Sequence, residues 1–393
     1  MAIQTAAKGI TLVQVQTPRD RRRFAGFPWR LYRDDAMWVP PLYRDQIKAI
    51  HPLKGDFFRR GGKGVCFMAL DSRGRVAGTI CAAMDPARNE NLRAMGKPSE
   101  CIFGFLEYRQ DPSVLRALIW QARKWALARG LERLVGPFNL DYEDRYGVLV
   151  DGWDHPPALL CGHSKPYYRE MMENEDFIAY RPDNVAYRVD LDQPNPALDR
   201  VMTLAKRVEQ GGRISLRGAD FSRLDREIDL VYSIINPCLE HLNDYVPFDR
   251  QDLADSLKAM KPLADPELIL FAQEGPEEKM VGWFPGLPNA NETLKTLNGL
   301  HRPWDYLRLP ALAFTRPRGL SVKSVLVLPE WWARGVSILF FARMRELARK
   351  KGYRWIDLSL TSLDNPYTPQ LAQRLGATLY KRYRVYTRDT SVA

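Results

Sequence analysis

Apolar and polar positions follow two different periods along the chain, and each change of period predicts a strand or a helix. Val325 and Val327 lie in a short β-branched run that predicts a buried strand, which Pro329 ends because proline cannot donate to a strand ladder. Apolar residues then recur at helical spacing and predict a helix over residues 338–351, with Gly352 as its stop. Further strands are expected over residues 354–360 and 378–386, with a short helix between them.

The first half of the chain predicts a similar series of elements. Its expected strands cover residues 10–15, 65–70, 76–84, 101–107 and 131–136, and its expected helices cover residues 19–32, 43–50 and 114–129. A helix that stops at Gly130 and leads into a strand corresponds to the helix that stops at Gly352. We therefore predict two copies of one α/β unit, residues 1–192 and 197–393, each a mixed, mainly antiparallel twisted sheet flanked by helices.

Composition narrows the class of protein without naming its activity. The chain has 393 residues, enough for two domains, and a net charge of +11, which attracts anionic ligands or surfaces. No run of apolar residues is long enough for a membrane span, and no nucleic-acid motif is recognised. The five cysteines are dispersed and form no CxxC pair, so neither a disulfide framework nor a metal site is expected. The expected location is the cytoplasm, including the inner face of the membrane.

The turn before the helix at 338–351 has the features of an anion site. Backbone N–H groups at the start of a helix have no partner within it, and the helix dipole adds partial positive charge there. Arg334 adds a full positive charge, and Gly335 allows a bulky diphosphate to approach the backbone. The predicted site comprises Trp332, Ala333, Arg334, Gly335, Val336 and Ser337. The alternative is an ordinary strand–turn–helix without a ligand.

This order of elements resembles the acyl-CoA-binding half of the GNAT acyltransferase superfamily. In that superfamily the loop usually reads Q/R-x-x-G-x-G/A and cradles the CoA pyrophosphate. Residues 332–337 match its glycine and its small last residue, but the first position is Trp332 instead of Gln or Arg. Other short segments, such as 104–107, 135–139, 150–153 and 381–386, extend the resemblance over nearly the whole chain to bacterial double-GNAT proteins, including the bacterial ceramide synthase type.

The resemblance also implies roles for individual residues. A backbone N–H near Val327 or Leu328 would polarise the thioester, and Asn365 and Tyr367 would contact CoA. Tyr367, Tyr380 or Tyr383 would protonate the leaving thiolate, unless each is an ordinary half-buried tyrosine. The base is less defined, and the candidates are Asp364 and Glu107, with Glu330 and His241 as further options.

The two copies are not expected to act alike. The turn after the central strand of the first copy carries Glu107 and Asp111, whose carboxylates would repel a diphosphate. We therefore predict that acyl-CoA binds the second copy only and that the first copy shapes the acceptor pocket.

The predicted function is an acyl-CoA-dependent N-acyltransferase without a metal. Aromatic residues in the segments 24–58 and 283–314, together with the basic balance, favour a bulky acceptor such as a long-chain sphingoid amine, which would give ceramide. Two alternatives remain: an acetyltransferase of a small-molecule or protein amine, and a CoA- or lipid-binding module without turnover.

Overall fold

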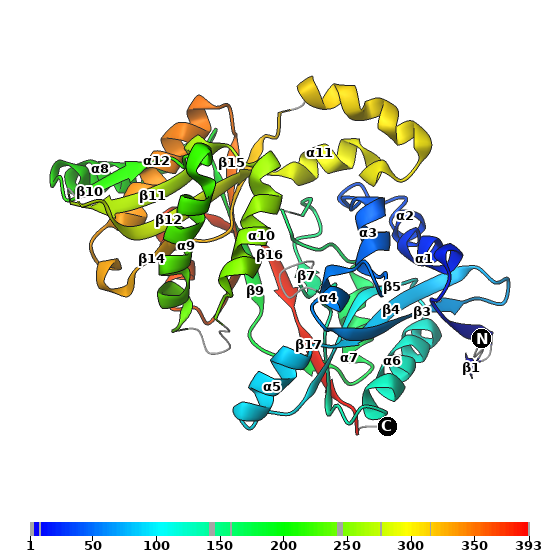
Figure 1. The fold of residues 1–393 in the computed structure, drawn as a ribbon. Coiled ribbons are helices and arrows are strands. Elements are labelled where there is room, and N and C mark those ends of the chain that lie inside the picture. Colours follow the sequence, from blue (N-terminus) through cyan, green and yellow to red (C-terminus); the bar gives the residue numbers. More distant parts are fainter. Residues whose placement is uncertain are drawn as a thin grey trace. The chain divides into compact units, whose positions relative to one another are not determined.

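The chain folds into two compact units, and neither unit is continuous in sequence (Figure 1). Unit 1 comprises Met1–Asn184, Thr293–Thr315 and Lys381–Ala393, and unit 2 comprises Val185–Glu292 and Arg316–Tyr380. The computed structural model describes residues 4–7, 9–140, 146–157, 159–241, 247–275, 277–314 and 316–391. These units are defined by which residues lie close together in space, which does not test whether the sequence is a repeat. The two copies at residues 1–192 and 197–393 therefore stay a prediction.

Unit 1 contains an eight-stranded sheet in the order β1-β2-β3-β4-β5-β6-β17-β8. Neighbouring strands pair antiparallel except β5 and β6, which pair parallel and are joined by helix α6 (Pro112–Leu127). The strands are β1 (Gln4–Ala7), β2 (Ile10–Gln14), β3 (Lys63–Leu70), β4 (Val76–Met84), β5 (Glu100–Tyr108), β6 (Arg133–Gly136), β17 (Tyr386–Asp389) and β8 (Ile178–Ala179). The apolar side of α6 packs on this sheet, with Val114, Leu118 and Ala122 fully buried.

The helix expected over residues 19–32 is wrong as a single element, because the structure has α1 (Pro18–Ala25) and α2 (Pro28–Leu31) there. Pro28 has no N–H to continue the helical ladder, and the carbonyl of Phe24 accepts from Phe27 instead. The remaining unit 1 helices are α3 (Tyr43–Ala49), α4 (Asp56–Arg59), α5 (Pro86–Ala94) and α7 (Tyr167–Glu173). Helix α11 (Ala290–Thr296) leads into the 3-10 turns η4 (Asn298–Leu300) and η5 (Pro303–Phe314).

Unit 2 contains strands in the order β10-β11-β12-β13-β15-β9-β16, and β14 pairs with β12 outside this order. Their bounds are β10 (Ile214–Arg217), β11 (Ile269–Glu274), β12 (Lys279–Pro288), β13 (Gly319–Val322), β14 (Leu326–Val327), β15 (Trp355–Ser362), β9 (Asn184–Asp190) and β16 (Thr378–Arg384). Strands β13 and β15 run parallel and are joined by α12 (Val336–Lys350), as β5 and β6 are joined by α6. The predicted helix at 338–351 is thus confirmed and begins at Val336.

Helices cover both faces of the unit 2 sheet. Val281, Phe284 and Val327 pack with Phe340 of α12, whereas Trp283 and Leu326 pack with α9 (Leu224–Leu239) and α10 (Arg250–Met260). The neighbours Trp283 and Phe284 face opposite sides, as in a regular strand. Val281 lies on the same side as Phe284 because the register of β11 and β12 shifts between Ala272 and Gln273, which leaves Val281 as an extra residue in β12. The other elements are α8 (Pro196–Gln210), α13 (Thr368–Arg374), η1 (Phe221–Arg223), η2 (Lys261–Leu263), η3 (Pro266–Leu268) and η6 (Pro329–Trp331). No helix in the described ranges has the length and apolar character that crossing a bilayer requires.

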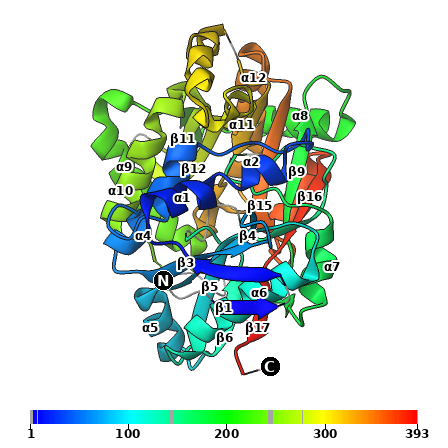
Figure 2. The ribbon, with the colours of Figure 1, turned by 90° about the vertical axis from the view of Figure 1, so that its right-hand side faces the viewer.

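The last strand of the chain does not stay with the elements that precede it. Strand β17 lies between β6 and β8 in the unit 1 sheet, with Tyr386 opposite Gly136. Figure 2 shows β17 next to β6. Conversely, β9 follows the unit 1 elements in sequence and takes a place between β15 and β16. Residues 381–384 of β16 belong to unit 1, where they pair with β7 (Val148–Asp151). Each sheet is therefore completed by a strand from a distant part of the chain.

Candidate functional site

The predicted anion site lies in unit 2 at the N-terminus of α12. Gly335 is the N-cap residue with φ 81° and ψ 7°, and no side chain caps this helix end. Among the described residues, the backbone N–H groups of Gly335, Val336 and Ser337 have no hydrogen-bond acceptor. Arg334 is exposed beside them, with its guanidinium 4.8 Å from the ring centre of Trp331. Free donors, a helix dipole and a cation therefore gather at one point, which suits a phosphate.

An aromatic group borders this helix end. The ring of Trp332 lies 4.7 Å from that of Tyr367 and 5.2 Å from that of His241. The indole N–H of Trp332 donates to the carbonyl of Val327 at 2.7 Å, which fixes the loop to strand β14. Tyr367 remains 52% exposed. The structure thus brings together Trp332, Tyr367 and His241, all of which were considered from the sequence. The bond to Val327 holds the ring of Trp332 in place at the position where the usual loop has Gln or Arg.

Strand pairing stops next to this loop. Strands β13 and β15 pair only from Gly319 opposite Trp355 to Val322 opposite Leu358, and β14 pairs with β12 alone. Leu328 donates its N–H to Val281 at 3.0 Å, so by the alternation of antiparallel pairs the amide of Val327 faces away from β12. The predicted backbone donor at Val327 therefore lies on an edge of β14 that no described strand covers.

The residues that follow β15 have local structural roles. The side-chain oxygen of Asn365 accepts hydrogen bonds from the N–H groups of Tyr367 and Thr368, at 2.9 and 3.1 Å, and so caps α13. Asp364 is exposed at the same turn. Neither position tests the predicted CoA contact of Asn365 or the predicted role of Asp364 as a base, so both stay predictions.

A buried carboxylate sits beneath the point where β13 and β15 separate. The hydroxyl of Tyr380 donates to Asp357 Oδ1 at 2.7 Å, and the hydroxyl of Ser359 donates to Oδ2 at 2.5 Å. Asp357 is fully buried, and burial raises its pKa despite the positive charge of Lys323 and these hydrogen bonds. The sequence interpretation included Tyr380 but missed Asp357, whose signal is a single acidic residue between Ile356 and Leu358.

The other two predicted catalytic residues belong to unit 1. Glu107 accepts hydrogen bonds from the hydroxyls of Tyr32 and Tyr168, at 2.7 and 2.8 Å. Burial raises the pKa of both tyrosines, and the negative charge of Glu107 raises it further. Tyr383 is fully buried and donates its hydroxyl to the carbonyl of Gly162 at 3.1 Å.

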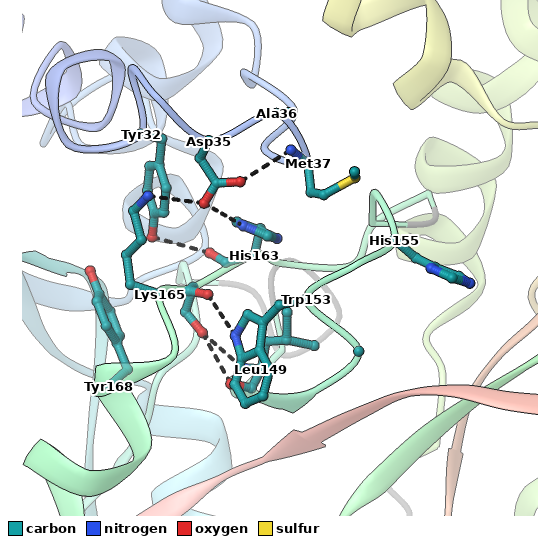
Figure 3. A network of polar contacts seen from close by, with 12 residues as sticks. Tyr32, Asp35, Ala36, Met37, Leu149, Trp153, His155, His163, Lys165 and Tyr168 are labelled. Atoms are coloured by element: carbon teal, nitrogen blue, oxygen red, sulfur yellow. Dashed lines mark hydrogen bonds and ion pairs between the residues drawn. The ribbon is translucent and has the colours of Figure 1, made fainter.

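A second polar group of unit 1 was missed from sequence (Figure 3). Asp35 Oδ2 lies 3.0 Å from His163 Nε2 and 3.0 Å from Lys165 Nζ, and Asp35 Oδ1 accepts the N–H of Met37 at 3.1 Å. His163 lies on the segment before α7, and a dashed line joins its ring to the carboxylate of Asp35 in Figure 3. No periodicity in the sequence links Asp35 to a histidine 128 residues away.

Comparison with solved structures identifies the architecture. A tandem GNAT protein from the clavulanic acid biosynthesis pathway matches with a TM-score of 0.57 over 98% of this chain and 99% of its own, at 13% identity. A GCN5-related N-acetyltransferase from Sphaerobacter thermophilus matches with a TM-score of 0.55 over 98% of this chain and 97% of its own, at 14% identity. The chain has the tandem GNAT fold.

Sequence relatives extend this likeness over the full length. A bacterial ceramide synthase from Caulobacter vibrioides is 28% identical over 98% of this chain and 99% of its own, and Protein YghO from Escherichia coli is 27% identical over 94% and 93%. No family model matches the chain. The predicted double-GNAT architecture is thereby confirmed, and the relatives and the tandem GNAT fold together support the predicted N-acyltransferase. Within the described ranges, no three or more His, Cys, Asp or Glu side chains form a metal-holding group.

Proposed function

We propose that the protein is an acyl-CoA-dependent N-acyltransferase whose donor binds at the N-terminus of α12. The observation that carries the proposal is the uncapped start of this helix at Gly335, with free N–H groups beside the cation of Arg334. A diphosphate would accept from these N–H groups and gain from the helix dipole. The flat faces of Trp332 and Tyr367 next to this point suit the ring system of a nucleotide.

The same unit supplies groups for the acyl transfer. The outward amide of Val327 would donate to the thioester oxygen, where negative charge grows in the transition state. A neutral amine forms the new C–N bond, the C–S bond breaks, and the thiolate needs a proton. The hydroxyl of Tyr380, which donates to Asp357 in this structure, would turn to the thiolate and give it that proton, and it would regain one proton from the nitrogen that becomes the amide.

The proposed acceptor is a long-chain amine of the sphingoid class, which would make the product a ceramide. Support comes from the full-length likeness to a protein named bacterial ceramide synthase. The alternative acceptor is a small-molecule or protein amine, which the likeness to a GCN5-related N-acetyltransferase favours.

Contact with an anionic membrane is part of the proposal, because a long-chain amine resides in lipid. The segment η5 exposes 56% of Trp304 and 81% of Leu307, and it carries Arg308 and directly follows Arg302. Exposed apolar side chains interleaved with cations favour the surface of an anionic bilayer. Co-sedimentation with vesicles, with and without an anionic lipid, tests this part separately.

The activity is tested by thiol release and product mass. The protein is incubated with acetyl-CoA or palmitoyl-CoA and with sphinganine, a small amine or an acceptor peptide. We expect thiol release with palmitoyl-CoA and sphinganine together, and an amide product of the matching mass. Turnover with acetyl-CoA and a small amine instead would favour the alternative acceptor. Tight CoA binding without thiol release from any pair would reject an enzyme and favour a binding module.

A further inference from the structure

We propose that Cys66 and Cys81 are a redox-sensitive pair that forms a disulfide between β3 and β4 of unit 1 when a small disulfide oxidant is present. This inference does not depend on the proposed N-acyltransferase activity, and its test needs no substrate. The sequence alone gave no such expectation, because the cysteines are dispersed and form no CxxC pair. The pairing of the two strands brings these cysteines together.

The two cysteines lie directly opposite each other in neighbouring antiparallel strands. Cys66 of β3 pairs with Cys81 of β4. The register between the strands is regular on both sides of this pair and shifts only between Ala69 and Leu70. Opposite residues of a ladder direct their side chains to the same face of the sheet, so both thiols point the same way.

The backbone of Cys66 shows which kind of cross-strand pair this is. Its carbonyl accepts the N–H of Val15 at 2.9 Å, so its hydrogen-bonding groups are directed at β2. Because the N–H and C=O of one residue in an antiparallel ladder point to the same neighbour, Cys66 and Cys81 form a non-hydrogen-bonded pair. The Cα atoms of such a pair lie about 4.5 Å apart, within the range of about 4.4–6.8 Å that a disulfide spans.

The two sulfur atoms are already in contact. The Sγ atom of Cys66 lies 2.9 Å from the Sγ atom of Cys81. A disulfide bond is about 2.05 Å long, so the sulfurs need to approach by less than about 1 Å. Both cysteines are free thiols in this structure. The bond would enclose residues 67–80, which form the turn of the hairpin, and would hold the middle of the two strands together.

A third cysteine of the same sheet lies on the opposite face. Phe67 and Ala82, which follow the two cysteines in sequence, pack in the core with α6, so Cys66 and Cys81 face the other side of the sheet. Cys101 of β5 belongs to the α6 core. It therefore provides a buried cysteine in the same sheet that should not take part in the bond.

Burial limits the rate of this oxidation. Cys66 is 5% exposed and Cys81 is fully buried. Burial, together with the contact with Cys66, raises the pKa of the Cys81 thiol, and the thiolate is the reactive form. An oxidant therefore reaches the pair when β3 and β4 are separated, as they are before the sheet closes during folding. Oxidation should be fast during refolding and slow in the folded protein.

The electron balance needs one small disulfide, for which oxidised glutathione is the probe. The thiolate of one cysteine attacks the S–S bond of oxidised glutathione, forms a mixed disulfide and releases one glutathione thiolate. The second cysteine attacks the protein sulfur of that mixed disulfide and releases the second glutathione. The protein loses two hydrogen atoms, and the oxidant gains them as two thiols. An excess of reduced thiol reverses both steps.

The experiment is refolding in glutathione buffer followed by thiol counting. Unfolded, reduced protein is refolded with both oxidised and reduced glutathione, or with reduced glutathione alone, and the remaining thiols are alkylated after denaturation. We expect the wild type to fall from five thiols to three in the oxidising buffer, with a protease map that joins Cys66 to Cys81. The melting temperature of the oxidised form should be about 5–10 °C higher, because closing a loop restricts the unfolded chain.

Matched cysteine variants assign the pair. Cys66→Ala and Cys81→Ala should each show no disulfide within the protein after the same refolding. Cys101→Ala removes a buried thiol from the same sheet and should still lose two thiols and form the bond. Folded, reduced wild type in the oxidising buffer should lose its thiols at least about tenfold more slowly than the refolding chain.

The wild-type results decide the inference even if a variant does not fold. Five remaining thiols after refolding in the oxidising buffer, or a mapped bond between any other two cysteines, would overturn it. A melting temperature that decreases on oxidation would also contradict it, because the sheet would then not accommodate the bond. Equal loss of thiols in Cys66→Ala and in the wild type would assign the oxidation to other cysteines.

Discussion

The two helices that follow equivalent strands, α6 in unit 1 and α12 in unit 2, begin in opposite ways. At α6, Asp111 is the N-cap residue, and its Oδ1 atom accepts the N–H of Ser113 at 3.0 Å and its hydroxyl at 2.6 Å. At α12, Gly335 occupies the N-cap position and offers no side chain. The same element order therefore gives one helix end that is closed by a carboxylate and one that is open to an anion.

The strand edges beside α6 and α12 differ in how far other parts of the chain cover them. In unit 1, Phe138 donates its N–H to Phe103 at 2.8 Å, and the side chain of Asn139 accepts the N–H of Phe105 at 2.8 Å. A Cβ atom at Gly104 would lie 1.5 Å from the carbonyl oxygen of Phe138, so the chain fills this gap closely. In unit 2 the indole N–H of Trp332 donates to the carbonyl of Val327, but the N–H of Val327 on the same edge has no acceptor among the described residues. The two units thus share this path of the chain but differ at the helix end and at the strand edge beside it.

The largest expected effect comes from giving α12 the cap of α6. We expect Gly335→Asp to lower CoA affinity by about 10²-fold, because a carboxylate near the diphosphate is repelled by about 1–4 kcal/mol per charge and also occupies the free N–H groups. Isothermal titration with CoA measures the loss.

The matched control for that substitution is Gly352→Asp at the other end of α12. Gly335 and Gly352 have φ values of 81° and 85°, so a side chain strains the backbone similarly at both positions, by about 1–2 kcal/mol. A Cβ atom at Gly335 would also lie 2.9 Å from a methyl carbon of Val208, whereas one at Gly352 would have no atom within 4 Å, so Gly335→Ala serves as a second control that has this contact without the charge. Only Gly335→Asp should affect CoA. An equal loss in both variants would mean that stability and not the anion site sets the affinity.

A tenfold effect is expected at Arg334. Arg334→Ala removes one exposed cation from the open helix end and should weaken CoA binding about tenfold, which corresponds to 1.4 kcal/mol. Arg349→Ala removes an equally exposed cation from the last turn of the same helix and should leave the affinity unchanged. The difference should shrink as salt increases, since exposed charges are screened. A difference that does not depend on salt would contradict a direct ionic contact.

The sequence predicted the elements of this comparison better than the pairing between distant parts of the chain. Helix α12 was predicted because its apolar spacing, its glycine stop and its basic last turn are all local. The place of β17 beside β6 was not predicted, because which distant strands pair depends on tertiary packing. Asp357 and the contact of Asp35 with His163 were missed for the same reason, since burial and partners appear only in the folded chain.

Removing the N-cap side chain of α6 should not turn this helix end into a CoA site. Asp111→Ala should lower stability by about 1 kcal/mol, as loss of an N-cap usually does, without creating a second CoA site. The gap beside β5 stays filled by Phe138 and Asn139, so an open helix end alone is insufficient. Thermal unfolding and the stoichiometry of CoA binding measure the two effects. Asp85→Ala, which removes the N-cap of α5, is the control for the stability change. A stoichiometry of two in Asp111→Ala would show that the cap alone decides.

The smallest effect concerns the carboxylate that only the second copy carries. Counted from the glycines that end α6 and α12, Asp357 corresponds to the apolar Val135 of the first copy. Burial raises the pKa of Asp357 in the folded state above the usual 3.8, so the folded protein binds its proton more tightly than the unfolded chain. Stability therefore decreases as pH rises from about 3.8 through the folded pKa, and this decrease is absent from Asp357→Asn. We expect the melting temperature of Asp357→Asn, relative to the wild type, to increase as the pH is raised from about 4 to 8, by about 2–4 °C for each kcal/mol. A difference that is constant over this range would mean that Asp357 keeps an ordinary pKa, and the contrast with Val135 would then have no electrostatic consequence.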